Sequence, residues 1–176
     1  HRDLHSFPTR RSSDLIKIDP PRPNAHTFTC DRAVAFKLGK QGIGTFAVLL
    51  HSENPAPTPT RLTLRPAAGP GDFNSTADLA TAETTVPPRS KGWVTFRFDA
   101  PVKPGFYYAW LPKKAGLSWA LHEEFIPDTG RAYRSGKDGW HPSGETYAFK
   151  IDEEVPPAVA DSLEAAPPPP ADMFAP

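Results

Sequence analysis

Apolar and polar residues alternate over most of the middle of the chain. In one such segment Leu62 and Leu64 fall on one face and polar residues fall on the other, which is the pattern of a strand with one buried face. The run Phe46–Leu50 is continuously apolar, as in a strand buried on both faces. The same period of two predicts further strands within residues 26–38, 92–100, 105–112, 117–121 and 146–151.

Segments rich in proline, glycine, asparagine and aspartate separate these runs. Such residues favour turns and interrupt strands. Several short strands with this punctuation predict an all-β fold, an antiparallel β-sandwich of jelly-roll type. The only stretch compatible with a helix is 78–83, and it could equally be a loop. The turn segments are 53–60, 66–76, 86–92, 100–105 and 135–144.

The C-terminal part of the chain differs from this middle, and the predicted sandwich module therefore covers residues 16–152. From Glu153 onward the sequence is rich in proline and alanine, with four consecutive prolines at 167–170. Such a composition has little to bury and predicts a disordered linker over residues 153–176. A peptide ligand of an SH3-type domain is the less favoured alternative. A linker leads us to expect a further domain downstream in the intact protein.

The first fifteen residues, HRDLHSFPTRRSSDL, show no apolar period and no helix cap. They resemble the translation of a forward adapter used in short-read DNA sequencing, whose codons encode His1 to Leu15 without a mismatch. Scars of this kind are excluded from fold reasoning. We therefore expect residues 1–15 to be a translated artefact, disordered and outside the fold, and the native polypeptide to begin near Ile16.

The charge of the chain is balanced. It has 20 basic and 20 acidic side chains, which become 17 and 18 when the three arginines and two aspartates of residues 1–15 are left out. A balanced surface creates no long-range field, so neither nucleic acid nor a membrane surface is expected as a partner. Cys30 is the only cysteine, which excludes an internal disulfide and a cysteine-based zinc site. The histidines have no spacing typical of a metal site.

Aromatic and charged side chains are interleaved between residues 110 and 140. Sugar rings stack on exposed aromatic faces while polar groups fix their orientation, so this set is a candidate carbohydrate site. The competing and favoured interpretation is that the rings fill the core. Trp140 lies in the loop richest in turn residues and is the best candidate for exposure. The candidate ligand-binding residues are Trp110, Trp119, Asp128, Arg131, Tyr133, Arg134 and Trp140.

A group of carboxylates offers an alternative from another functional class. Glu123, Glu124 and Asp128 lie close together in sequence, and paired carboxylates serve glycosidases as acid and base. In an extended segment, however, neighbouring side chains point to opposite faces. Solvated charges are therefore the favoured interpretation, no catalytic residue is assigned, and a glycan-acting enzyme domain stays the alternative.

Three segments carry a family resemblance: VPPRSKGWVTFRFDAPVKPGFYYAWLPKKAGLSWAL, then GRAYRSGKDGW, then GETYAFKI. Together they resemble the β-sandwich region that lies C-terminal to the flavin domain in certain bacterial FAD-dependent oxidoreductases, over about Thr27–Ile151. The resemblance implies a module of a larger bacterial protein, with the neighbouring domains of that protein as partners. Together with the aromatic candidates, it leads us to expect a non-catalytic accessory module for carbohydrate recognition or domain scaffolding. The family's dinucleotide fingerprint has no counterpart here, so we expect FAD in the parent protein and no cofactor in this chain.

Overall fold

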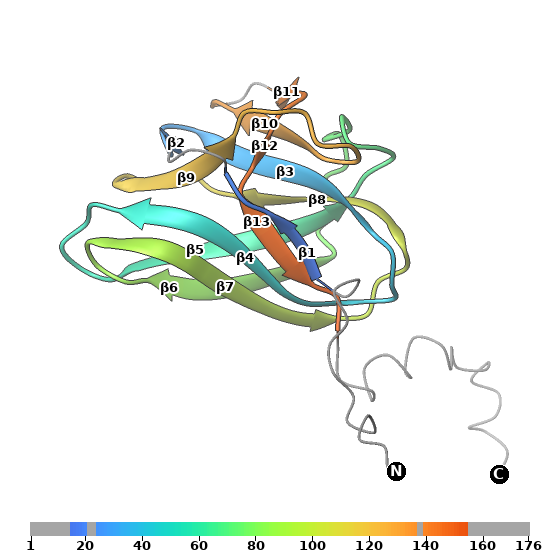
Figure 1. Cartoon of the computed structure of the whole chain (residues 1–176), viewed down its shortest axis with the longest axis horizontal. Coiled ribbons are helices and arrows are strands. Elements are labelled where there is room, and N and C mark those ends of the chain that lie inside the picture. The colour runs from blue at the N-terminus through green and yellow to red at the C-terminus, as the bar shows by residue number, and fades with distance from the viewer. Residues whose placement is uncertain (1–14, 21–23, 137–138, 155–176) are drawn as a thin grey trace, which may run out of the picture.

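The computed structural model describes residues 15–20, 24–136 and 139–154, and the regular secondary structure within them consists of β-strands (Figure 1). The strands form two packed antiparallel sheets, so the predicted all-β sandwich is confirmed. Its jelly-roll type stays a prediction. Residues 1–14 of the adapter segment and 155–176 of the predicted linker lie outside the described residues. Nothing in the described part of the chain is a helix that could cross a bilayer.

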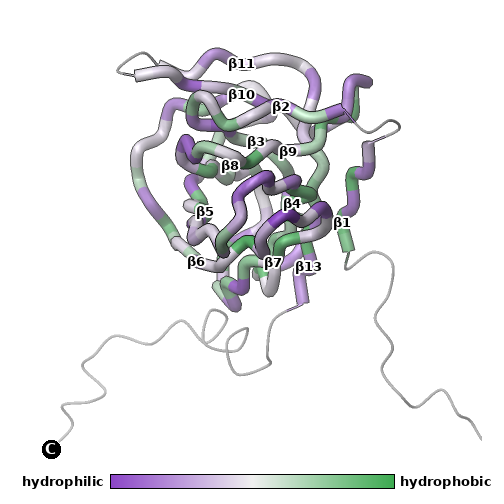
Figure 2. The backbone as a smooth tube through the Cα atoms, turned by 90° about the vertical axis from the view of Figure 1, so that its left-hand side faces the viewer, coloured by the Kyte–Doolittle hydropathy of each residue, from purple (hydrophilic) through white to green (hydrophobic). Residues whose placement is uncertain are grey.

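The described residues form thirteen strands. Figure 2 shows the layers edge-on, with β8, β5 and β6 on one side and β4, β9 and β7 on the other. The seven-stranded sheet contains β1 (Leu15–Ile18), β2 (Ala25–Thr27), β4 (Ile43–Ser52), β7 (Ser90–Ala100), β9 (Leu117–His122), β12 (Thr146–Tyr147) and β13 (Phe149–Asp152). The six-stranded sheet has the order β11 (His141–Ser143), β10 (Gly130–Arg134), β3 (Asp31–Leu38), β8 (Gly105–Leu111), β5 (Thr58–Pro66) and β6 (Ala80–Val86).

β4 is the central strand of the seven-stranded sheet. It pairs with β7 on one side, and on the other side with β13 and, further along, with β9. The segment 146–152 pairs first with β9 and then with β4, entering the sheet where those two strands separate. Ala148, at the change of partner, bonds to both, since its N–H donates to the Ala120 carbonyl and its own carbonyl accepts from Leu49.

The main core lies between the two sheets, and the long strands contribute alternate residues to it. Leu62 and Leu64 of β5 are fully buried there, as the alternation predicts. Phe46 of β4 stacks on Phe149 of β13, with ring centroids 5.5 Å apart. β8 is buried on both faces, because a second and smaller apolar cluster covers its outer side.

Two strands include residues for which the sequence predicted no strand. Leu15, the last residue of the segment expected to be disordered, lies in β1 opposite Asp152. The stretch 78–83, considered as a short helix or a loop, enters β6 at Ala80. The physical reason is that β6 is rich in threonine and ends in valine, and such β-branched residues favour strands when a partner such as β5 is available.

Glu153, the first residue of the predicted linker, belongs to the fold. Its side chain is only 5% exposed, and its Oε1 accepts the backbone N–H groups of Gly39 at 2.8 Å and Lys40 at 2.9 Å. These N–H groups lie in the turn between β3 and β4 and have no strand partner. A buried carboxylate that satisfies two turn amides is structural, so the folded module extends beyond the predicted end at residue 152.

Candidate ligand-binding site

The second apolar cluster lies on the outer face of the six-stranded sheet. The alanines of β3 and β10 have short side chains and leave space above the sheet. Tyr108 and Trp110, which point outward from β8, fill this space, and the loop before β6 adds Phe73. The cluster comprises Ala33, Ala35, Phe73, Tyr108, Trp110 and Ala132, with Ala67 and Trp140 packed against it.

The loop 67–79, between β5 and β6, covers this outer face and is bonded to it. The Tyr108 hydroxyl donates to the carbonyl of Ser75. The Arg65 guanidinium donates to the Tyr108 hydroxyl at 3.1 Å and to Asp78 Oδ1 at 2.6 Å. The loop is therefore tied to β5 and β8 by a connected set of hydrogen bonds.

Two further features fix the shape of this loop. The Asp72 carboxylate accepts the N–H groups of Ala68 at 2.7 Å and Asn74 at 3.0 Å, and these bonds hold the pKa of Asp72 below its usual value. Gly130 of β10 lets the loop approach the sheet, since a Cβ at this position would lie 2.3 Å from the Pro70 carbonyl oxygen. The loop rests directly on the backbone of β10.

Arg134 of β10 lies against both indole rings of the cluster, which contact each other edge to face. Its guanidinium carbon is 5.1 Å from the Trp110 ring centroid and 4.5 Å from that of Trp140. Its Nη2 donates to Asp31 Oδ2 at 2.9 Å. Such a geometry combines cation–π attraction with a charge-assisted hydrogen bond. The indole N–H groups of Trp110 and Trp140 are both buried and have no hydrogen-bond partner among the described residues.

A hollow of about 550 Å³ opens beside this cluster, and we call it the Trp140 hollow. Its walls combine the Trp140 ring with hydrogen-bonding groups of both kinds. Its arginines are ion-paired, Arg65 with Asp78 and Arg134 with Asp31, so charge in the hollow is locally balanced. Its lining includes Asp31, Arg65, Asn74, Thr76, Arg134 and Trp140. An aromatic wall with a few fixed polar groups is typical of a site for a small polar ligand.

Of the predicted site residues, the structure brings together Trp110, Arg134 and Trp140. Trp110 is only 8% exposed and lies under the other two, so it supports the site without lining the hollow. Trp140 is half-buried and does line it. The predicted aromatic platform is therefore reduced to one indole ring, held by an arginine.

Trp119 lies in the main core, which removes it from the predicted platform. It is 0% exposed and stacks on Tyr147 with ring centroids 4.6 Å apart. Its indole N–H donates to the Ala148 carbonyl at 2.7 Å. The reason is the alternation of β9, which places Trp119 on the buried side together with Leu117 and Leu121.

Arg131 belongs to a separate polar cluster on the other face of β10. Its Nη2 donates to Glu145 Oε1 at 2.5 Å, and its Nη1 lies 3.4 Å from His26 Nδ1. Arg32 Nη1 donates to the Tyr147 hydroxyl at 3.0 Å, and that hydroxyl lies 3.2 Å from His26 Nδ1. The cluster joins residues from β2, β3, β10 and β12.

Burial and charge set the protonation of this cluster. Burial, with the positive charges of Arg131 and Arg32, lowers the pKa of His26. Burial raises the pKa of Tyr147. A neutral imidazole can accept a hydrogen bond at Nδ1 from the hydroxyl of a protonated phenol. Tyr147 is fully buried, and its bonds to His26 and Arg32 connect three strands.

The remaining predicted residues lie on the surface outside the Trp140 hollow. Tyr133 is 46% exposed and stacks on His141. Glu123, Glu124 and Asp128 are all exposed. Glu123 accepts a hydrogen bond from the Asn24 side chain at 3.0 Å. The described residues also contain no group of three or more histidine, cysteine or acidic side chains that could hold a metal ion.

Sequence reasoning missed the residues that build the hollow, above all Asp31, Arg65 and Phe73. The signal that could have found this face is the small size of Ala33 and Ala35, which alternate with large inward residues and leave space for a covering element. In comparisons with known proteins, no family model and no curated protein matches the chain. The function is therefore argued from the geometry of the site.

Proposed function

We propose that the chain is a non-catalytic accessory module that binds a carbohydrate at the Trp140 hollow. The observation that carries the proposal is a half-buried indole ring that lines a hollow together with fixed donors and acceptors. A sugar has an apolar C–H face and a rim of hydroxyl groups. The ring matches the face, and the Arg134–Asp31 pair with Asn74 and Thr76 offers partners for hydroxyls.

The polar groups of the hollow are positioned before a ligand arrives. Arg134 is held by Asp31, and Arg65 is held by Tyr108 and Asp78. Side chains that are already fixed lose little conformational entropy on binding, so more of the interaction energy appears as affinity. Preorganisation of this kind supports a binding role for a site that has only one half-buried indole ring.

The parent protein is the second part of the proposal. We infer an accessory role in a larger bacterial protein similar to an FAD-dependent oxidoreductase, supported by the resemblance of segments 86–121, 130–140 and 144–151. FAD would bind the parent's own flavin domain. Sequencing the intact gene tests this: a glycine-rich strand–helix fingerprint upstream supports it, and a signal peptide directly before the sandwich contradicts it.

Glycan binding by the full chain tests the carbohydrate proposal. The informative variant is Trp140→Ala and the matched control is Trp93→Ala. Trp93 is also a half-buried indole, with the Lys150 ammonium 4.7 Å from its ring centroid, but it lies on β7 in the other sheet. On a glycan array followed by calorimetry, we expect Trp140→Ala to lower affinity about tenfold or more, which is about 1.4 kcal/mol.

The control variant Trp93→Ala should keep the wild-type affinity. Circular dichroism and urea unfolding establish that both variants are folded. If the folded wild-type chain binds no glycan, or if both variants lose affinity equally, the carbohydrate proposal is wrong.

A further inference from the structure

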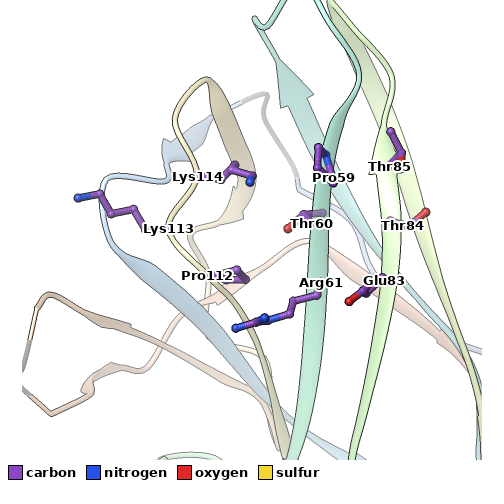
Figure 3. Close-up of a pocket in the computed structure, with 9 residues that line it drawn as sticks. All are labelled: Pro59, Thr60, Arg61, Glu83, Thr84, Thr85, Pro112, Lys113 and Lys114. Carbon is purple, nitrogen blue, oxygen red and sulfur yellow. The ribbon is translucent and has the colours of Figure 1, made fainter.

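A second hollow, also of about 550 Å³, lies between β5 and the segment 112–114 that follows β8 (Figure 3). β5 and β8 are paired only from Thr63 to Pro66 of β5. Beyond that point Pro112 has no N–H with which to continue the ladder. The two segments therefore separate, and the space between them is the second hollow, which we call the basic hollow.

Three cationic residues line the basic hollow: Arg61 from β5, and Lys113 and Lys114 from the other side. In Figure 3 the Lys113 side chain extends away from β5. Figure 3 shows the Arg61 side chain extending from β5 toward the segment that carries the two lysines. None of the three side chains has an ion-pair partner in the part of the chain that the structure describes. Glu83, the acidic residue of the lining, is the cross-strand neighbour of Arg61 but is not within ion-pair distance of it.

The local charge of this hollow contrasts with the rest of the molecule. The whole chain is electrically balanced, and both arginines of the Trp140 hollow are paired with aspartates. A local excess of positive charge in a concave surface attracts anions. A guanidinium matches two oxygens of a carboxylate or sulfate, and lysines add compact charges. The chemistry of the basic hollow is therefore that of an anion site.

Thr60 provides a second observation that points to a polar ligand. It lines the hollow, is 7% exposed, and its hydroxyl is buried without a hydrogen-bond partner among the described residues. Figure 3 shows its oxygen on the side of β5 that faces the gap. A buried hydroxyl without a partner costs free energy, and an oxygen seated in the hollow would reduce that cost.

The linings of the two hollows are in direct contact at one point. Asp31 lines the Trp140 hollow and Lys113 lines the basic hollow, and Asp31 Oδ1 accepts the backbone N–H of Lys113 at 2.8 Å. The same aspartate binds Arg134. One hydrogen-bonded residue pair thus links the linings of the two hollows.

We propose that the basic hollow binds an anionic substituent, a carboxylate or a sulfate, of the saccharide whose ring is held at the Trp140 hollow. The inference rests on the proposed carbohydrate function and specifies its ligand class: an acidic saccharide. The Trp140 ring contacts the apolar face of one sugar unit, and Arg61, Lys113 and Lys114 bind the charged group of the same unit or its neighbour.

The test uses an array of glycans in matched sets that share one backbone as neutral, uronate-containing and sulfated members. We expect the wild-type chain to bind an acidic member about tenfold or more tightly than its neutral counterpart, with a preference that falls as salt is raised from about 0.1 M to about 1 M. The uronate and sulfate arms identify which anion is bound.

Variants assign the effect to the basic hollow. Arg61→Gln and the double variant Lys113→Gln/Lys114→Gln should reduce the affinity for acidic members toward that of neutral ones and leave neutral binding unchanged. The control is Lys91→Gln/Lys103→Gln, which removes the same charge from exposed positions that line neither hollow.

The outcomes separate this inference from the proposed function. Equal binding of neutral and acidic members by the wild-type chain overturns the anion site and leaves the carbohydrate function standing. An acidic preference that survives in the Arg61 and Lys113/Lys114 variants also overturns it. If no glycan of any kind is bound, the proposed function fails and the anion site fails with it.

Discussion

The guanidinium carbon of Arg134 lies 4.5 Å from the ring centroid of Trp140. Arg134 is on a strand and is anchored to Asp31, whereas Trp140 lies in the loop before β11. The strand residue therefore positions the loop residue. Arg134 is in this sense a positioning residue for the one indole ring that lines the hollow.

Arg134→Ala should weaken glycan binding by releasing the Trp140 ring. A cation–π contact of this kind contributes about 0.5–2 kcal/mol, so the ring should become more accessible to solvent. Acrylamide quenching of tryptophan fluorescence measures that accessibility beside glycan affinity. Arg134→Lys keeps the charge but loses the planar guanidinium, and should restore only part of both readouts. Unchanged quenching in Arg134→Ala would show that the loop holds Trp140 without help.

The inward face of each strand could be predicted from the sequence. Val34 and Leu62, for example, lie in the main core because period-two alternation reports which side chains share a face. The same rule places Trp119 inside, since it alternates with Leu117 and Leu121. Alternation in β9 thus distinguishes Trp119, as a core residue, from Trp140, which lies in a loop.

The outer face could not be predicted in the same way. Whether Tyr108 and Trp110 are solvated or covered depends on the loop 67–79, which folds back across β8 and β10. That loop has no period, and its position is set by single contacts such as the Tyr108 hydroxyl with the Ser75 carbonyl and Gly130 with Pro70. Such contacts join residues far apart in sequence, so no local sequence pattern predicts them.

The close approach at Gly130 can be tested directly. Gly130→Ala places a methyl group 2.3 Å from the Pro70 carbonyl oxygen, so the loop must move away from β10. We expect a loss of about 1–3 kcal/mol in the free energy of unfolding, typical of overpacking, and weaker glycan binding because the loop lines the hollow. Urea unfolding and glycan titration measure the two effects.

Gly71→Ala is the matched control for this loop. A Cβ at Gly71 meets nothing within 4 Å, so both stability and binding should stay close to wild type. If Gly130→Ala behaves like Gly71→Ala, the loop does not rest on β10 in solution.

The buried carboxylate at the C-terminal end of the fold gives a further expectation. Glu153→Ala leaves the N–H groups of Gly39 and Lys40 without their acceptor, which should cost about 1–3 kcal/mol of unfolding free energy. Glu153→Gln keeps an acceptor oxygen and should cost less. Glu124→Ala removes an exposed carboxylate and serves as the control in urea unfolding. If Glu153→Ala and the control have equal unfolding free energies, Glu153 does not stabilise the fold, and the fold ends at residue 152.

The cluster around His26 should make stability depend on pH. In the folded chain the pKa of His26 lies below its usual value of 6.5, because burial and the charges of Arg131 and Arg32 oppose protonation. The unfolded chain keeps the usual pKa, so it binds more protons than the folded chain as pH falls through 6.5. Stability is therefore present in full above that pH, decreases as pH falls, and levels off below the folded pKa.

Two variants at this cluster separate titration of the ring from loss of its contacts. His26→Asn cannot titrate but retains an acceptor for the Tyr147 hydroxyl, so the stability of wild type relative to this variant should fall as pH is lowered from about 7.5 to about 5.5. Tyr147→Phe removes the hydroxyl but keeps the burial of His26 and both arginines, which are the main causes of the pKa shift. Its stability should therefore fall with pH as in wild type.

Urea unfolding at several pH values measures the stability of both variants and of wild type. A wild-type advantage over His26→Asn that is the same at every pH would mean that His26 titrates alike in the folded and unfolded chains, and that its role is confined to the hydrogen bond with Tyr147.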